Sequence, residues 1–156
     1  MGWIRVETCI DGTKHCFEIE SDAWKLNFPS GILLDTPDKI TQICISKERI
    51  VIRTEDPDFR NGNMLAPILK ESRRINNINA YDHNGVHQWN IGDLVGDIHM
   101  QFDYVTHITA AEAKQLYGVK IHKTKHQLYS CIAEGFVYLI DANDKRLLYR
   151  ISGEVK

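Results

Sequence analysis

The sequence predicts an α+β fold that is rich in β-structure, with antiparallel hairpins and meanders of about nine to ten strands covered by one or two helices. Dipeptides such as Asn84-Gly85 and Asp11-Gly12 lie between runs of alternating polarity, which is typical of two-residue hairpin turns. One segment, residues 109–118, carries helix signals at both ends. With 156 residues the chain has the length of a single domain, and we expect residues 1–156 to form one globular unit.

Composition and charge exclude several classes of protein. The net charge of −2 argues against general binding to nucleic acid or to a membrane surface. No apolar run approaches the roughly 20 residues of a membrane span, and the N-terminus lacks the pattern of a secretory signal. We therefore expect a soluble cytoplasmic protein. Its four cysteines have no Cys-x-x-Cys pair and are interpreted as reduced thiols: Cys9, Cys16, Cys44 and Cys131.

Residues 3–20 predict the first hairpin, with its turn at residues 11–12. This register sets Arg5 opposite Glu18 on a solvent-facing side, and Cys9 and Cys16 fall on the same side without facing each other. The other side of the hairpin is apolar and collects Ile4, Val6, Phe17 and Ile19.

The next segments are less uniform. Residues 21–35 fit a short helix that carries Trp24 and Phe28 and is ended by residues 29–31, followed by a short buried strand at residues 32–34. Residues 40–54 predict a hairpin in which Gln42 and Arg53 lie opposite each other on the outside. An acidic loop at residues 55–63 follows, and residues 64–74 fit either a helix that starts near Pro67 or an edge strand.

Residues 75–94 predict a central hairpin around the Asn84-Gly85 dipeptide. A two-residue turn pairs Asp82 with His87 and Ala80 with Trp89. One face is then apolar, and we expect it to bury Ile78, Ala80, Trp89 and Ile91. The other face is expected to be largely wet and carries Asn79, Tyr81, Gln88 and Asn90.

The C-terminal part predicts a strand, a helix and a meander. Residues 95–104 alternate in polarity like a strand. Thr109 and Glu112 form a capping box for a helix that ends before Gly118. Residues 127–141 form a hairpin that is apolar on both faces, which indicates the middle of a sheet covered by the helix, and residues 147–151 add a last strand.

The histidines do not predict a metal site. Two pairs have His-x-x-x-His spacing, but that spacing suits a helix. His83 and His87 flank a turn and are expected on opposite faces, while His122 and His126 lie among lysines without a carboxylate nearby. We expect no metal and no cofactor.

One acid–base pair stands out, because the predicted register places Asp82 beside His87. No serine or cysteine nucleophile accompanies the pair in the sequence, and Cys44 and Cys131 lie in apolar strands where thiols are inert. The favoured interpretation is that Asp82 binds backbone groups of the turn and that His87 fills a rim position.

A basic stretch raises the possibility of nucleic-acid binding. Its lysines could follow a phosphate backbone while Tyr117 or Tyr129 stacks on a base. The net charge and the absence of a nucleic-acid-binding motif argue against this function. The residues concerned are Lys114, Lys120, Lys123 and Lys125.

The sequence favours a non-catalytic interaction module that binds and regulates or neutralises a protein partner. This hypothesis depends mainly on the missing catalytic motifs, and its polar hairpin faces supply the residue types found at interfaces. The expected binding residues are Arg5, Glu18, Tyr81, Gln88 and Asn90. The alternatives are a small hydrolase-like enzyme using Asp82 and His87, and a nucleic-acid binder using the basic stretch.

Overall fold

The computed structural model describes residues 2–10, 12–21, 24–36, 38–55, 76–96, 101–122, 127–133 and 135–152. Within these ranges the chain forms twelve strands and two helices, which confirms the prediction of a β-rich α+β fold. The loop, helix or edge strand predicted between residues 56 and 74 lies outside the described residues. No helix in the described ranges is long and apolar enough to cross a membrane.

The first sheet has six strands in the order β2-β1-β5-β6-β7-β8. Its neighbours are antiparallel except for β1 and β5, which are parallel. The strands are β1 (Trp3–Ile10), β2 (Thr13–Glu20), β5 (Lys39–Ser46), β6 (Ile50–Glu55), β7 (Ile78–Tyr81) and β8 (His87–Asn90).

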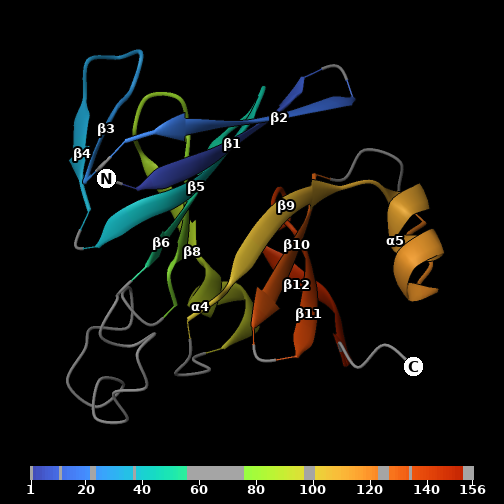
Figure 1. Cartoon of the computed structure of the whole chain (residues 1–156). Helices are drawn as coiled ribbons and strands as arrows, with labels where there is room; N and C mark the ends of the chain where they lie inside the picture. Colours follow the sequence, from blue (N-terminus) through green and yellow to red (C-terminus); the bar gives the residue numbers. More distant parts are fainter. Residues whose placement is uncertain are drawn as a thin grey trace, which may run out of the picture.

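A small hairpin covers part of the outer face of this sheet (Figure 1). It consists of β3 (Lys25–Asn27) and β4 (Leu33–Asp35), and the helix considered for this segment is wrong. Phe28 follows β3 and is buried against the sheet. Its ring centroid lies 5.8 Å from that of Tyr81.

The second sheet has four antiparallel strands in the order β12-β11-β10-β9. They are β9 (Tyr104–Ile108), β10 (Leu128–Ala133), β11 (Phe136–Asp141) and β12 (Arg146–Ser152). Helix α5 (Ala110–Tyr117) packs on one face, where Ala113 meets Leu128 and Leu139. The prediction that the β10–β11 hairpin lies in the middle of a helix-covered sheet is confirmed.

The other face of the second sheet packs on the first sheet, and we call this contact the seam. Its apolar part joins Val51, Ala80 and Trp89 of the first sheet to Tyr129, Cys131 and Tyr138 of the second. Its polar part joins Glu7, Gln42 and Arg53 of the first sheet to His107 and the main chain of Phe102 and Val105. Trp89 is only 2% exposed and lies opposite Ala80, as predicted.

Three predicted hairpin registers are confirmed. Arg5 pairs with Glu18 in the first, Gln42 with Arg53 in the second and Cys131 with Tyr138 in the third. In the first two hairpins the alternation of polarity agrees with this pairing. The third is apolar on both faces, and its register follows instead from the turn at Gly135.

The register predicted for the central hairpin is wrong beyond Ala80. Asp82 donates its N–H to the Val86 carbonyl, so residues 83–85 form a three-residue loop instead of a two-residue turn. Gly85 has φ +87°, the left-handed conformation that such loops require. The longer loop pairs His87 with Tyr81 rather than with Asp82, and a bulge between Ala80 and Tyr81 then restores the predicted pairing of Ala80 with Trp89.

The wet faces predicted for two hairpins are also wrong. Asn79, Tyr81 and Asn90 are buried, and so are Gln42 and Arg53. The reason is that both faces of the first sheet are covered, one by the β3–β4 hairpin and the other by the second sheet. A polar side chain on a covered face then forms hydrogen bonds with other groups of the same chain instead of with water.

Of the described residues within the strand predicted for 95–104, only Tyr104 belongs to a strand, because β9 begins there. Residues 97–100 lie outside the described residues. Helix α4 (Ile91–Val95) precedes them and has a capping box formed by Asn90 and Asp93. The capping box of Thr109 and Glu112 and the left-handed Gly118 after α5 are confirmed.

Candidate functional site

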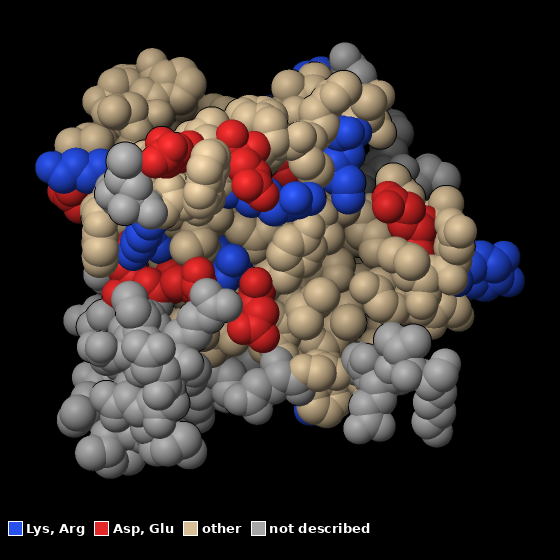
Figure 2. All heavy atoms as spheres, viewed as in Figure 1, with Lys and Arg blue, Asp and Glu red and all other residues tan. Residues whose placement is uncertain are grey.

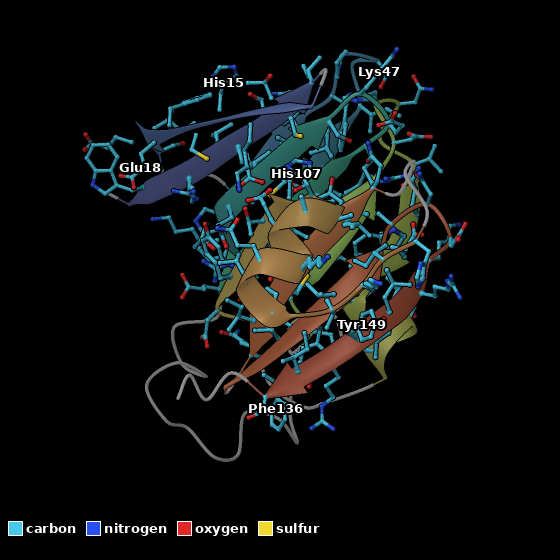
Figure 3. All side chains as sticks on the ribbon, turned by 90° about the vertical axis from the view of Figure 1, so that its right-hand side faces the viewer. His15, Glu18, Lys47, His107, Phe136 and Tyr149 are labelled. Atoms are coloured by element: carbon cyan, nitrogen blue, oxygen red, sulfur yellow. The ribbon has the colours of Figure 1, made fainter. Side chains whose placement is uncertain are left out.

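The polar part of the seam contains a buried group of three potential metal ligands. Glu7 and Cys44 are opposite each other on the parallel strands β1 and β5, and His107 approaches them from β9. A carboxylate oxygen, the sulfur and an imidazole nitrogen all lie within 4.8 Å of one another. Glu7 and Cys44 are each 1% exposed and His107 is 7% exposed. Figure 3 shows His107 between the two sheets.

Hydrogen bonds hold the Glu7 carboxylate in place. Its Oε1 accepts from the backbone N–H of His107 at 2.5 Å and from His107 Nδ1 at 2.6 Å. Its Oε2 accepts from the Thr106 hydroxyl at 2.6 Å. Burial raises the pKa of Glu7, but the hydrogen bonds from His107 and Thr106 lower it further, so the net shift is downward. Glu7 is therefore an ionised carboxylate at neutral pH.

His107 is oriented by this carboxylate. With Nδ1 donating to Glu7, a neutral imidazole carries its lone pair on Nε2. The Nε2 atom is buried and has no hydrogen-bond partner among the described residues. The imidazole ring stacks on Tyr129, with the two centroids 4.6 Å apart. Of the two ring nitrogens, Nδ1 is therefore the one that faces the Glu7 carboxylate.

Two cysteines flank Glu7 on the same face of the first sheet. Cys44 is buried, its Sγ lies 3.8 Å from the Val105 carbonyl, and burial raises the pKa of its thiol well above the usual value. Cys16 lies opposite Glu7 on β2, is exposed, and has its Sγ 3.9 Å from Glu7 Oε2. Arg5 donates to Cys16 Sγ at 3.2 Å.

This chemistry favours binding over turnover. A histidine oriented by a carboxylate and placed near a thiol has the components of a nucleophilic site. However, Cys44 is buried, and its raised thiol pKa leaves it protonated. A nucleophile must meet its substrate, and Cys44 does not reach the surface. The same ligand types are those that bind zinc.

A second candidate site lies at the outer edge of the first sheet. Strand β2 ends the sheet, and all eight of its residues are exposed (Figure 1). Phe17 is 50% exposed and Ile19 is 41% exposed. His15 and Glu18 are labelled on this strand in Figure 3. An apolar edge strand of this kind is a template for pairing with another chain.

The structure separates the five predicted binding residues. Arg5 and Glu18 lie together on the first hairpin, where Arg5 is half-buried over the Tyr104 ring and Glu18 is exposed. Tyr81 and Asn90 are buried and do not reach the surface. Gln88 is half-buried and accepts a hydrogen bond from Arg49 Nε at 3.0 Å.

Asp82 and His87 do not form the predicted acid–base pair. Asp82 Oδ1 accepts from the backbone N–H groups of Asn84 and Val86, both at 2.9 Å, which is the turn role favoured from the sequence. His87 Nε2 lies 3.0 Å from Asn79 Oδ1, and its ring packs edge-on against Tyr81.

His83 also has a separate environment, because its Nε2 lies 2.8 Å from the Ser46 carbonyl. Of the basic stretch, Lys114 and Lys120 are exposed, while Lys123 and Lys125 lie outside the described residues. On the face shown in Figure 2, basic and acidic side chains lie close to one another. The function of the lysines stays a prediction.

No sequence signal points to the Glu7, Cys44 and His107 group. Glu7 and His107 are 100 residues apart, so no local spacing relates them. The sequence shows only that Glu7 takes a polar position in the alternating pattern of the first hairpin, and this pattern fits a solvent-exposed face equally well. No family model, curated protein or solved structure matches the chain.

Proposed function

We propose that the protein is a non-catalytic interaction module that binds an extended segment of a protein partner along the free edge of β2. The observation that carries this proposal is that all eight residues of an edge strand are exposed, the apolar Phe17 and Ile19 among them. Edge strands are usually short, charged or covered, since an uncovered edge pairs readily with other chains. The partner segment would add a seventh strand to the first sheet.

The backbone pairing at the end of β2 shows which of its residues point their N–H and C=O groups away from β1. Ser21 donates its N–H to the Gly2 carbonyl, so this pair is hydrogen-bonded. Antiparallel ladders alternate between bonded and non-bonded pairs, which directs the backbone groups of Phe17 and Ile19 towards β1. The intervening residues direct their N–H and C=O groups outward, and these are Lys14, Cys16, Glu18 and Glu20.

The side chains of β2 define the chemistry of the partner. Phe17 and Ile19 lie on one face of the strand and favour apolar residues opposite them. Glu18 and Glu20 lie on the other face and favour basic residues, while Lys14 favours an acidic one. The proposed partner segment therefore alternates apolar with charged residues and is basic where it meets the two glutamates.

The probe is the peptide Arg-Val-Arg-Val-Thr-Val-Glu-Val, measured by fluorescence anisotropy. In antiparallel pairing its arginines meet Glu20 and Glu18, and its glutamate meets Lys14. We expect binding to the intact chain that weakens at least about tenfold, or about 1.4 kcal/mol, when arginine and glutamate positions are exchanged. N-methylation of the threonine and the second arginine should abolish binding, because it removes N–H groups that would reach β2.

Two variants of the protein complete the test. Glu18→Pro removes an outward N–H, whereas Glu18→Ala keeps it and removes only the charge. We expect Glu18→Pro to bind the peptide more weakly than Glu18→Ala, with circular dichroism confirming that both variants fold. Equal binding of the N-methylated peptide would overturn the proposal. Self-association of the intact chain that Glu18→Pro abolishes would also overturn it, since the occupant would be a second copy.

A further inference from the structure

We propose that Glu7, Cys44 and His107 form a zinc-binding site in the polar part of the seam. This site is independent of the β2 edge and adds a second function to the molecule. The three side chains come from β1, β5 and β9, so a bound ion would link the two sheets. Their potential ligand atoms already lie within 4.8 Å of one another.

The ligand types and distances suit zinc with small side-chain movements. Zinc binds thiolate sulfur, imidazole nitrogen and carboxylate oxygen at about 2.0–2.3 Å, which in a tetrahedral site places ligand atoms roughly 3.3–3.7 Å apart. The sulfur would therefore move inward, while the Glu7 and His107 atoms, now 2.6 Å apart, would separate. Each change is on the order of 1 Å, which side-chain torsions can supply without a shift of the strands.

The charges balance. A divalent cation, the Glu7 carboxylate and a Cys44 thiolate together carry no net charge, and a neutral group is the kind that tolerates burial. The thiol of Cys44 has a proton to lose, and a coordinated thiol is deprotonated by the ion itself. Lys14 lies at the rim, where its ammonium group is 3.2 Å from the His107 carbonyl.

Contacts other than the ion fix the imidazole in place. His107 is more than nine-tenths buried, and its ring stacks on Tyr129 with the centroids 4.6 Å apart. Its Nδ1 already faces the Glu7 carboxylate at 2.6 Å. Zinc bound between these two atoms would replace their hydrogen bond, and the imidazole proton would then lie on Nε2.

The fourth position can be taken by water, as in open zinc sites. Cys16 is on the exposed side of Glu7 and its sulfur is 3.9 Å from Glu7 Oε2. It therefore marks the side from which an ion can enter. By contrast, Cys131 is buried in the apolar part of the seam and supplies a matched control for Cys44.

The experiment titrates the metal-free full chain with Zn²⁺ and with Co²⁺. We expect one ion per chain, a rise in melting temperature with zinc, and release of about one proton from Cys44. The cobalt complex should show the absorption of a thiolate-to-metal charge transfer. Failure of the wild-type chain to bind either ion at micromolar concentrations would overturn the proposal.

Variants identify the ligands. Cys44→Ala and His107→Ala should each weaken zinc binding at least about tenfold, as loss of a ligand or its partner does, and Cys44→Ala should remove the charge-transfer absorption. Cys131→Ala should bind zinc like the wild type. Retention of the absorption in Cys44→Ala would overturn the site, because the metal would then be held by other thiols.

X-ray absorption of the zinc-loaded wild-type chain provides a test that needs no variant and therefore remains decisive if Cys44→Ala does not fold. We expect sulfur near 2.3 Å together with nitrogen or oxygen near 2.0–2.1 Å. One sulfur per ion corresponds to Cys44. A spectrum without sulfur would overturn the proposal.

Discussion

The two parts of the seam hold the sheets together by different means. In the apolar part, Trp89 and its neighbours stabilise the fold by removing apolar surface from water, a contribution that depends little on direction. In the polar part, Gln42 accepts from the Val105 N–H at 3.0 Å and donates to the Val105 carbonyl at 3.1 Å. These bonds are directional, and they are satisfied in only one alignment of the sheets.

The comparison teaches that stability and alignment come from different residues. A typical buried hydrogen bond adds only about 0.5–1.5 kcal/mol, but an unpaired group costs more. The polar part therefore disfavours other alignments more than it strengthens the observed one. Arg53 illustrates this, since its guanidinium joins Gln42 to the Phe102 carbonyl across the seam.

The largest effect is expected in the apolar part. Trp89→Ala should lower the free energy of unfolding by about 3–5 kcal/mol, because it leaves a cavity in a packed region. The indole N–H also donates to the Ala142 carbonyl at 3.3 Å. Urea denaturation measures the change, and a loss below about 1 kcal/mol would contradict the packing described for Trp89.

A smaller effect is expected for Glu7→Gln in the polar part. The amide keeps the shape of the side chain but replaces charge-assisted hydrogen bonds with neutral ones. We expect the free energy of unfolding at neutral pH to fall by about 1.5–3 kcal/mol. Denaturation of the metal-free chain isolates this effect from ion binding. Unchanged stability would show that His107 and Thr106 gain nothing from the charge.

The same carboxylate predicts how stability depends on pH. The pKa of Glu7 in the folded chain lies below its ordinary value of 4.5, so the folded state favours the ionised form. The stabilisation is complete above the unfolded pKa and is lost as the pH falls through the folded pKa. The stability difference between wild type and Glu7→Gln should therefore be constant near neutral pH and decrease below about pH 4.5. A difference that grows in acid would contradict this sign.

The smallest change in stability is expected between serine variants of the two buried cysteines. Cys131→Ser places a hydroxyl in the apolar part, where it must desolvate, whereas Cys44→Ser places one near the Val105 carbonyl. We expect Cys131→Ser to be less stable than Cys44→Ser by about 1 kcal/mol in the metal-free chain. Thermal unfolding of the two variants measures the difference, and the reverse order would move the boundary between the two parts.

The sequence predicted the elements whose signals are local. The first hairpin, the β10–β11 hairpin and α5 follow from turn residues, alternation and a capping box within short windows. The Asn84-Gly85 turn shows the limit of such signals. The dipeptide serves a three-residue loop as well as a two-residue turn, and one residue of difference separates Asp82 from His87.

The polar part of the seam could not be predicted because alternation does not say what covers a polar face. Gln42 and Arg53 have the pattern of a solvent-facing pair, yet they hydrogen-bond to the main chain of Val105 and Phe102, in and just before the first strand of the second sheet. The partner of Glu7 is likewise a residue of the second sheet, His107. The alternation of polarity distinguishes the two faces of each strand. Which segment covers a face depends on contacts between residues far apart in the chain.

The separation of the two sheets along the chain has a consequence for folding during synthesis. The strands of the first sheet end at Asn90, and those of the second begin at Tyr104. The first sheet can therefore pair its strands while the ribosome has yet to make the partner of Glu7, which lies 100 residues further on. During that interval Glu7, Gln42 and Arg53 place polar groups on the face that the second sheet later covers, which reduces the apolar surface that the nascent chain exposes. Joining such distant residues is slow, so docking of the two sheets is expected to be the late step.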